Sequence, residues 1–322
     1  MRVLVLHSDV PPDAPPDEQD TLIAAKAVSD ALASRGHQAP LAPFVPGTAA
    51  MRALLARHAP DVVFNLVEGI DGKGSLAYIA PRILDEIGVP YTGTGAQGLI
   101  DTGDKPLAKR LLREAGLPTP DWSEPPDWDG LALQTRYIVK AAEEDASLGL
   151  DDASVVVGAA VQARAEACAS RFGGHWFAEA YVEGREFNIG VIEEQGAPRV
   201  LPMAEMTFAQ WPAGRPKIVG YTAKWDDASF ESTRTVRAFA VEEREPQLAG
   251  DLRSLAERAW LLFKLRGTAR VDFRVDAGGR AWILEINPNP GIAPDAGLVA
   301  AAERAGLSYA DLIEKIVRAA LA

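Results

Sequence analysis

The segment that most constrains the fold is residues 269–291, ARVDFRVDAGGRAWILEINPNPG. Polar and apolar side chains alternate on both sides of the pair Gly278-Gly279. A period of two residues predicts strands, and two glycines suit a two-residue turn with positive φ, so the sequence predicts a β-hairpin. The register of that hairpin places the carboxylate of Asp272 directly opposite the carboxylate of Glu285.

The two faces of this hairpin differ in polarity. Because side chains alternate along a strand, Arg270 and Asn287 share the face of the two carboxylates. The other face is predicted to be apolar and is formed by Val271, Phe273, Leu284 and Ile286. Opposed carboxylates repel each other unless a cation lies between them, and Mg²⁺ takes carboxylate and amide oxygens together with nucleotide phosphates. The polar face is therefore either a metal–phosphate site or a solvated surface. The ending N-P-N-P-G favours the site, because it removes backbone donors and permits close approach of a ligand.

The pattern of strands and helices divides the chain into three parts. Residues 1–92 alternate strand-like and helix-like segments, which predicts a parallel α/β domain. A helix preceded by Asp104 and ended by Gly116, with Pro106 in its first turn, opens the next unit. The expected domains are an N-terminal α/β domain at 1–92, a central α+β lobe at 93–182 and a C-terminal α+β lobe at 183–322.

Composition excludes several classes of partner. The net charge of -12 argues against a nucleic-acid or anionic-membrane surface, because phosphate backbones are bound by excess Lys and Arg. No stretch reaches the ~18 consecutive apolar residues that a membrane helix needs. The lone cysteine, Cys168, cannot form an internal disulfide, and the N-terminus lacks the apolar run of a signal peptide. We expect a cytoplasmic protein with no nucleic-acid or membrane partner.

Two glycine patterns suggest cofactor sites. Gly93, Gly95 and Gly98 match the G-x-G-x-x-G of dinucleotide-binding folds. That fingerprint needs a helix that follows at once, and IDTGDK is expected to intervene before any helix begins, so a dinucleotide oxidoreductase is the weakest interpretation. Residues 69–75, GIDGKGS, follow a strand and form either a loop whose N–H groups hold an anion or a flexible turn.

The motifs of the hairpin resemble those of a known family. R-x-D followed by E-x-N-P-x-P-G is similar to the metal motif of ATP-grasp enzymes of the D-alanine–D-alanine ligase type, and the resemblance covers nearly the whole chain in the right order. It implies a three-domain ATP-grasp fold whose central and C-terminal lobes clamp ATP. It also implies that Asp272 binds one Mg²⁺, that Glu285 bridges two and that Asn287 binds the second, with Mn²⁺ as an alternative ion. Arg270 and the backbone at Gly291 would face the tetrahedral intermediate.

Other stretches resemble the ATP-binding parts of the family. VPYTGTG followed by DK implies that Lys105 binds nucleotide, and YIVKAAEEDASLG implies that Lys140 contacts the phosphates and Ser147 lies near the γ-phosphate. The stretch AEAYVEGREFNIGV resembles the part that follows the adenine and ribose. It implies base contacts from Glu179 and from the backbone at Tyr181 and Val182, and ribose contacts from Glu186. YTAKW resembles the loop whose lysine, Lys224 here, reaches the transferred phosphate.

The chain departs from the family pattern at the amino-acid end. The segment HSDVPPDAPPDEQD, at 7–20, has prolines where the family has a glycine-rich loop. Glu18 is therefore the candidate carboxylate for binding the substrate, and Gln19 is nearly as well placed. Asp295 stands where the family has a substrate-binding serine, and Trp225 follows the loop lysine where tyrosine or phenylalanine is usual. Trp225 and Asp295 are therefore candidate specificity residues. The acidic EEDAS of the phosphate loop is a further departure.

These features together predict a ligase. ATP would phosphorylate a carboxylate, and an amine would then displace phosphate from the acyl phosphate to form an amide between two small amino-acid-like substrates. Lysines suit the phosphates as point charges, whereas the planar fork of Arg270 suits an oxyanion. The alternatives are a related amino-acid ligase of a different biosynthetic pathway and an ATP-binding module without ligase activity. A homodimer is expected.

Overall fold

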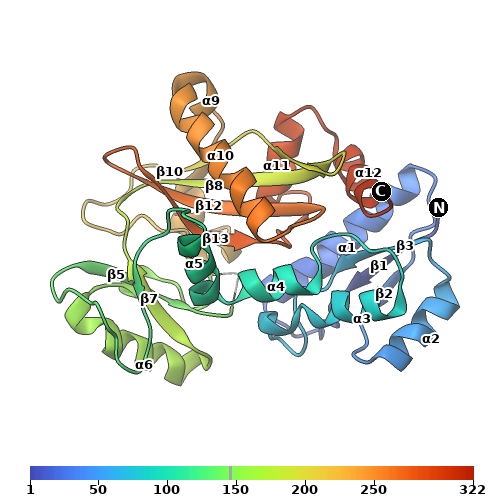
Figure 1. Ribbon diagram of the computed structural model, residues 1–322, viewed down its shortest axis with the longest axis horizontal. Coiled ribbons are helices and arrows are strands. Elements are labelled where there is room, and N and C mark those ends of the chain that lie inside the picture. The colour runs from blue at the N-terminus through green and yellow to red at the C-terminus, as the bar shows by residue number, and fades with distance from the viewer. Residues whose placement is uncertain (145–146) are drawn as a thin grey trace.

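The computed structural model describes residues 1–144 and 147–322, so part of the acidic phosphate loop, residues 145–146, lies outside the described residues. The N-terminal part contains a parallel sheet of order β2-β1-β3. Its elements are β1 (Val3–His7), α1 (Pro16–Ser34), β2 (Leu41–Pro43), α2 (Thr48–His58), β3 (Val62–Leu66), the short helix η1 (Gly74–Leu76) and α3 (Ile79–Ile87). The predicted parallel α/β domain is confirmed, and it lies at the right of Figure 1. All of β3 and most of β1 are buried, as expected for strands covered on both faces.

A second sheet, which is antiparallel and has the order β4-β7-β5-β6, lies at the lower left of Figure 1. The elements here are α4 (Ala96–Gly103), α5 (Lys105–Glu114), β4 (Trp122–Ser123), β5 (Arg136–Ala141), η2 (Asp152–Ser154), β6 (Val155–Val157), η3 (Gly158–Ala160), α6 (Val161–Phe172) and β7 (Trp176–Ala180). Helix α5 begins as the sequence predicts, since the Asp104 side chain accepts a hydrogen bond from the Leu107 N–H.

The largest sheet has the order β11-β10-β8-β12-β13, with β9 paired to β8. It is built from β8 (Gly184–Glu194), β9 (Ala197–Val200), β10 (Ala204–Phe208), β11 (Thr235–Ala238), β12 (Thr268–Asp276) and β13 (Ala281–Asn287). The helices of this part are α7 (Tyr221–Trp225), α8 (Phe230–Arg234), α9 (Val241–Arg244), α10 (Pro246–Leu262), α11 (Gly297–Arg304) and α12 (Tyr309–Ala319). Within residues 1–144 and 147–322, no helix combines the length and hydropathy needed to cross a membrane.

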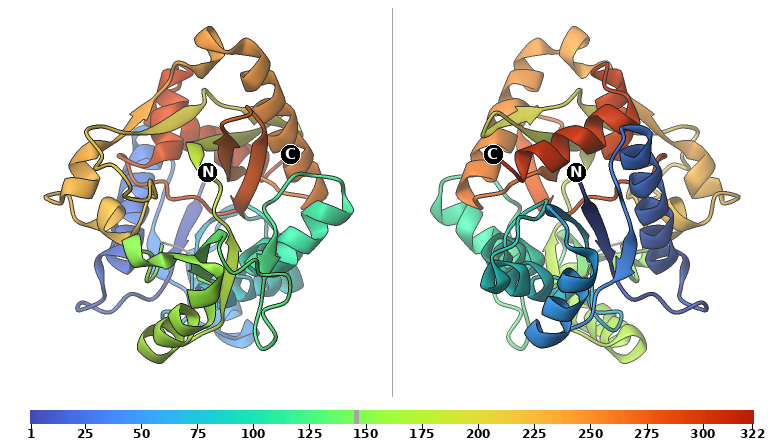
Figure 2. Two further views of the ribbon diagram at one scale, coloured as in Figure 1. Left: turned by 90° about the vertical axis from the view of Figure 1, so that its left-hand side faces the viewer. Right: turned by 90° about the vertical axis from the view of Figure 1, so that its right-hand side faces the viewer.

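The hydrophobic cores join these parts. Val3 and Val28 of the N-terminal part share one core with Leu298 and Ile313 of the last two helices. The right-hand view of Figure 2 shows those red helices beside the blue N-terminal part. Leu112 of α5 packs instead into the core beneath β8 and β12. Buried apolar contacts therefore join α1, α5, β8, β12 and β13, which contribute to the walls of the cavity described below. The domain division at 92 and 182 remains a prediction.

The hairpin of β12 and β13 confirms the predicted pairs and corrects the turn. Arg270 pairs with Asn287 and Asp272 pairs with Glu285. The predicted two-residue turn is wrong. Asp276 and Arg280 pair around a three-residue loop in which Gly279 adopts φ +80°, and the Asp276 carboxylate accepts hydrogen bonds from the N–H groups of Gly278 and Arg280.

A β-bulge restores the register at the functional end of the hairpin. It lies after Asp272, so that Phe273 pairs with Ile283 rather than with Leu284. Leu284 consequently lines the cavity, whereas the sequence predicted it on the apolar face with Val271 and Phe273. The extra residue of the bulge compensates for the extra residue of the turn. The opposed carboxylates therefore stay where the alternation of the sequence predicts them.

The glycine patterns also need a correction. Helix α4 begins directly after Gly95, so the expectation that no helix follows G-x-G-x-x-G is wrong. Gly98 lies inside α4, where a Cβ would come within 2.4 Å of Thr94 and 3.0 Å of the Phe263 carbonyl oxygen, so this glycine serves close packing. In the loop at 69–75, the Gly74 N–H lies 3.4 Å from a carboxylate oxygen of Glu144, its acceptor.

Candidate active site

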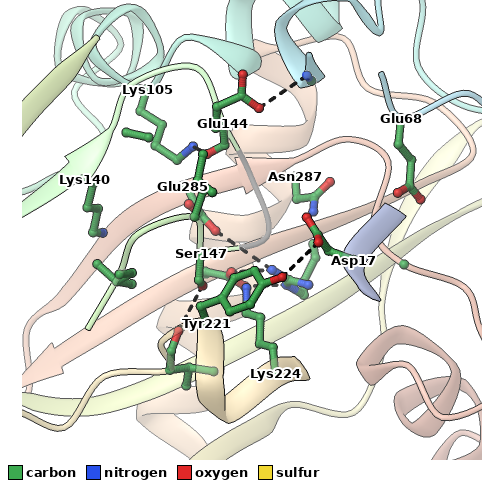
Figure 3. A pocket seen from close by; sticks show the side chains of 18 of the residues that line it. Asp17, Glu68, Lys105, Lys140, Glu144, Ser147, Tyr221, Lys224, Glu285 and Asn287 are labelled. Carbon is green, nitrogen blue, oxygen red and sulfur yellow. Dashed lines mark hydrogen bonds and ion pairs between the residues drawn. The ribbon is translucent and has the colours of Figure 1, made fainter. Parts of the chain in front are cut away.

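A cavity of about 1590 Å³ is lined by all three parts of the chain. Every site residue predicted from the sequence lines it: Glu18, Lys105, Lys140, Ser147, Glu179, Tyr181, Val182, Glu186, Lys224, Trp225, Arg270, Asp272, Glu285, Asn287, Gly291 and Asp295. Figure 3 shows several of these side chains converging from different elements. The fold thus brings together residues that are far apart in the sequence, while the role of each remains a prediction.

The polar face of the hairpin forms one wall. Arg270 donates from Nε and Nη2 to the two carboxylate oxygens of Asp272, both at 2.8 Å, and its Nη2 lies 3.9 Å from Oε1 of Glu285. The Asn287 side-chain oxygen accepts a hydrogen bond from the Asn289 N–H at 3.0 Å. One guanidinium therefore lies close to both opposed carboxylates, which lowers the repulsion that the sequence predicts between them.

The donor set of this wall fits a hard divalent cation. Two carboxylates and one amide oxygen face the same cavity from adjacent strands, and such oxygens are the ligands of Mg²⁺ when phosphates and water complete its octahedron. Among the described residues, no cluster of three or more His, Cys, Asp or Glu side chains could hold a metal by itself. A metal bound by Asp272, Glu285 and Asn287 would thus depend on phosphate oxygens from a nucleotide.

Lysines surround the hairpin carboxylates. Burial raises the pKa of Glu285, but Lys105, Lys140, Lys224 and Arg270 together lower it to about 2. Lys105 is buried and donates from Nζ to the Glu144 carbonyl oxygen at 2.7 Å. These cations come from α5, β5, α7 and β12, so four positive side chains gather around the hairpin carboxylates although the chain as a whole is acidic. Such a concentration of ammonium groups suits a polyphosphate.

Ser147 and Tyr221 connect the phosphate loop and the lysine loop to their surroundings. The Ser147 hydroxyl donates to the Val219 carbonyl oxygen at 3.0 Å, just before α7. The Tyr221 hydroxyl donates to the Asp17 carboxylate at 3.0 Å, and burial together with this bond raises the pKa of Tyr221 to about 12. Glu18, which is predicted to bind the substrate, lines the cavity beside Gly72, and its neighbour Asp17 lines it as well.

Glu179 lies at the predicted base end and is 1% exposed. Its Oε1 accepts a hydrogen bond from Lys140 at 2.5 Å, and its Oε2 forms an ion pair with the Nζ of Lys109 at 2.5 Å. Burial raises the pKa of Glu179, but the two lysines reverse that shift and hold the pKa below its ordinary value. Lys109 was missed in the sequence, although it lies one helical turn after Lys105 on the buried face of α5.

The predicted ribose carboxylate is also paired. Glu186 lies 2.9 Å from the guanidinium of Arg274, and both side chains are buried. Burial raises the pKa of Glu186, which the charge of Arg274 opposes. The Arg274 guanidinium also lies 5.7 Å from the ring centroid of Tyr181. Arg274 was missed as well, although the alternation of β12 places it on the face of Arg270 and Asp272.

The end of the cavity that is predicted to bind the amino-acid substrates is acidic. Asp20 and Asp295 both line it, and burial and the charge of Asp295 both raise the pKa of Asp20. The Asp295 backbone oxygen accepts from Arg237 at 2.9 Å. Trp225 follows Lys224 at the end of α7, and its ring lies 6.5 Å from that of Tyr221.

Comparison with known proteins shows the family of the chain. The family model described as "D-ala D-ala ligase C-terminus" matches residues 130–318, more than half of the chain. The chain belongs to the D-alanine–D-alanine ligase family. It is 32% identical to the D-alanine–D-alanine ligase of Moorella thermoacetica over 100% of this chain and 99% of that protein. It is equally similar, at 32%, to the uncharacterized protein y4sG of Sinorhizobium fredii, over 91% of this chain and 86% of that protein.

Solved structures of the D-alanine–D-alanine ligase family share the fold. The crystal structure of the Bacillus anthracis D-alanine–D-alanine ligase complexed with ATP superposes with a TM-score of 0.76, covers 100% of this chain and 97% of that one, and is 19% identical. The ligase of Coxiella burnetii gives a TM-score of 0.72 at 18% identity, over 100% and 95% of the two chains. The ATP-grasp fold expected from the sequence is confirmed.

Proposed function

We propose that this chain is an ATP-dependent, ADP-forming ligase that joins two small amino-acid-like substrates through an amide bond, as its relatives named D-alanine–D-alanine ligase imply. ATP phosphorylates the carboxylate of the first substrate, and the amine of the second displaces phosphate from the acyl phosphate. The observation that carries this proposal is the convergence of three lysines on the carboxylates of the β12–β13 hairpin within one cavity.

The side chains of the cavity divide the chemistry between them. Lys105, Lys140 and Lys224 neutralise the β- and γ-phosphate oxygens, because phosphoryl transfer depends mainly on positioning and charge neutralisation. Arg270 offers paired donors to the oxyanion of the tetrahedral intermediate, and the Gly291 N–H offers another. Ser147 lies near the γ-phosphate. These roles rest on the resemblance of the motifs and on the shared cavity.

The nucleotide occupies the end of the cavity that Glu179 and Glu186 define. Glu179 and the backbone at Tyr181 and Val182 contact the base, and Glu186 contacts the ribose hydroxyls. Asp272, Glu285 and Asn287 would hold two Mg²⁺ ions, or Mn²⁺ in their place, and the ions would supply charge neutralisation to the phosphates.

A second candidate is an amino-acid ligase whose substrate carries an additional ammonium group. The amino-acid end of the cavity is lined by the carboxylates of Asp17, Glu18, Asp20, Glu68, Asp71 and Asp295. Burial and the charge of Asp295 both raise the pKa of Asp20, so this wall disfavours further negative charge. The side-chain ammonium group of a basic substrate would relieve that repulsion, whereas alanine, a zwitterion without net charge, has no additional positive charge to offer. This observation favours a related ligase with a basic substrate as the alternative.

Product analysis tests both candidates. The protein is incubated with ATP and mixtures of D- and L-amino acids, including basic ones, while ADP release is followed and condensation products are identified by mass spectrometry. Amino-acid-dependent ADP release with a dipeptide product supports the ligase, and the product mass separates the two candidates. Tight ATP binding without turnover in any mixture would support an ATP-binding module instead. The homodimer and the cytoplasmic location remain proposals, which light scattering and cell fractionation would test.

A further inference from the structure

Lys109 is a buried cation to which the proposed mechanism gives no task. Its side chain is 1% exposed, and it does not line the cavity. An ammonium group out of water is costly unless it is paired and hydrogen-bonded. Its Nζ lies 2.5 Å from Oε2 of Glu179 and donates to the Thr119 hydroxyl oxygen at 2.9 Å. Burial lowers the pKa of Lys109, and the charge of Glu179 opposes that shift.

Glu179 shares its two oxygens between a buried lysine and an accessible one. Lys109 forms an ion pair with Oε2, while Oε1 accepts a hydrogen bond from Lys140. The side chain of Lys140 is 14% exposed and lines the cavity. One carboxylate between two ammonium groups leaves a net positive charge. If Lys140 moves to a phosphate, Glu179 and Lys109 remain as a neutral pair, and no unpaired carboxylate is left in the interior.

Hydrogen bonds also connect Lys109 to the hairpin. The Thr119 hydroxyl donates to the Ile283 carbonyl oxygen at 2.9 Å, and the Ile283 N–H donates to the Pro118 carbonyl oxygen at 2.8 Å. Ile283 lies on β13, two residues before Glu285. Lys109 therefore contacts the base-end carboxylate directly and the metal-ligand strand through one hydroxyl.

We propose that Lys109 is a positioning residue for nucleotide binding, which acts by balancing the charge of Glu179 so that Lys140 is released to the phosphates. The inference rests on the proposed function, because Glu179 and Lys140 are taken to contact ATP. An ionised Glu179 only accepts hydrogen bonds, so it suits the amino group of adenine and repels the carbonyl oxygen of guanine. Lys109 thus supports both phosphate binding and the choice of base.

Calorimetric binding of non-hydrolysable ATP and GTP analogues tests this role. We expect Lys109→Met to weaken binding of the ATP analogue by roughly ten- to one-hundredfold, the range seen when the outer partner of a metal ligand is lost, and to weaken the GTP analogue less. Arg110→Gln is the matched control, because Arg110 follows Lys109 on α5 but forms an exposed ion pair with Glu124. Binding by this control should equal that of the wild type.

The Glu179→Gln background separates a positioning role from a structural one. If Lys109 acts through Glu179, adding Lys109→Met to Glu179→Gln should cost little further affinity. The same loss in both backgrounds would overturn the inference. If Lys109→Met alone does not fold, Glu179→Gln is compared with the double variant, and a roughly tenfold or larger further loss in that background would overturn the inference. A wild type that binds neither analogue would overturn the proposed function as well. A wild type that binds ATP analogue and a Lys109→Met variant that matches it would overturn only the role of Lys109.

Discussion

The hydroxyl of Tyr221 donates to the carboxylate of Asp17 at 3.0 Å, across the cavity between α7 and the first turn of α1. Figure 3 shows this bond beside Lys224, which lies on the same short helix as Tyr221. The bond fixes the lysine loop to the N-terminal part of the chain. It also identifies Asp17 as the acidic residue of the proline-rich segment that contacts another element of the site.

We expect Asp17→Asn and Tyr221→Phe each to lower kcat by roughly tenfold or more, because a hydrogen bond to a charged group is worth about 1.5–3 kcal/mol. The loss should appear in kcat rather than in the free energy of unfolding, since the bond positions the loop that carries Lys224 over the phosphates. Steady-state kinetics with the identified substrates measures this. Glu18→Gln is the matched comparison, and a larger loss in Glu18→Gln than in Asp17→Asn would restore Glu18 as the more important carboxylate.

Glu285→Gln should abolish metal-dependent turnover while the protein remains folded. The substitution keeps the size of the side chain but removes the charge that is proposed to bridge two ions, so we expect kcat to fall by roughly a hundredfold or more. Removal of Mg²⁺ with EDTA should abolish wild-type activity, and Mn²⁺ should restore it. Glu303→Gln, at an exposed position of α11, is the control. Near-normal turnover by Glu285→Gln would contradict the metal assignment.

The hairpin shows how far the sequence alone could predict the site. Alternation correctly places Asp272 opposite Glu285, because only one register buries Val271 and Ile286. The length of the turn was predicted incorrectly, since the Asp276 carboxylate stabilises a longer loop through two backbone N–H groups. A bulge then compensates for that loop. Two errors of one residue cancel, so the functional end of the hairpin was predicted for a partly incorrect reason.

The paired partners of the site could not be predicted from alternation. Arg274 lies on the polar face as the period of two requires, but its contact with Glu186 depends on β8 lying next to β12, which is a property of the sheet order. The ion pair between Lys109 and Glu179 likewise joins helix α5 to strand β7, which lies far from α5 in the sequence. Periodicity reports which face a residue occupies and does not report which distant element covers that face.

The pH dependence of stability should show an acid limb that Glu285 sets. Its folded pKa of about 2 lies below its ordinary value of 4.5, so its contribution to stability is fully present above pH 4.5 and is lost as the pH falls toward 2. We expect Tm of the wild type to fall more steeply over this window than Tm of Glu285→Gln. Calorimetric scans between pH 2 and 6 measure the difference, and equal slopes would show that the surrounding lysines do not depress this pKa.

Asp295→Asn should change which substrates react more than it changes ATP binding. Asp295 raises the pKa of Asp20 and contributes to an acidic wall of the cavity, while the end proposed to hold the nucleotide lies against Glu179 and the lysines. Loss of this charge should favour neutral substrates such as D-alanine over basic ones by roughly tenfold in kcat/KM, because one charge at close range is worth about 1 kcal/mol or more. It should also lower the pKa of Asp20 toward its ordinary value. KM for ATP should stay within twofold of the wild type.

Trp225→Tyr should likewise shift substrate choice, since Trp225 lies beside Tyr221 at the end of the lysine loop. Asp251→Asn, on the exposed side of α10, provides the control. Competition between D-alanine and a basic amino acid, read out by product mass, measures the ratio, and an equal loss for every substrate pair would argue against a specificity role for Asp295.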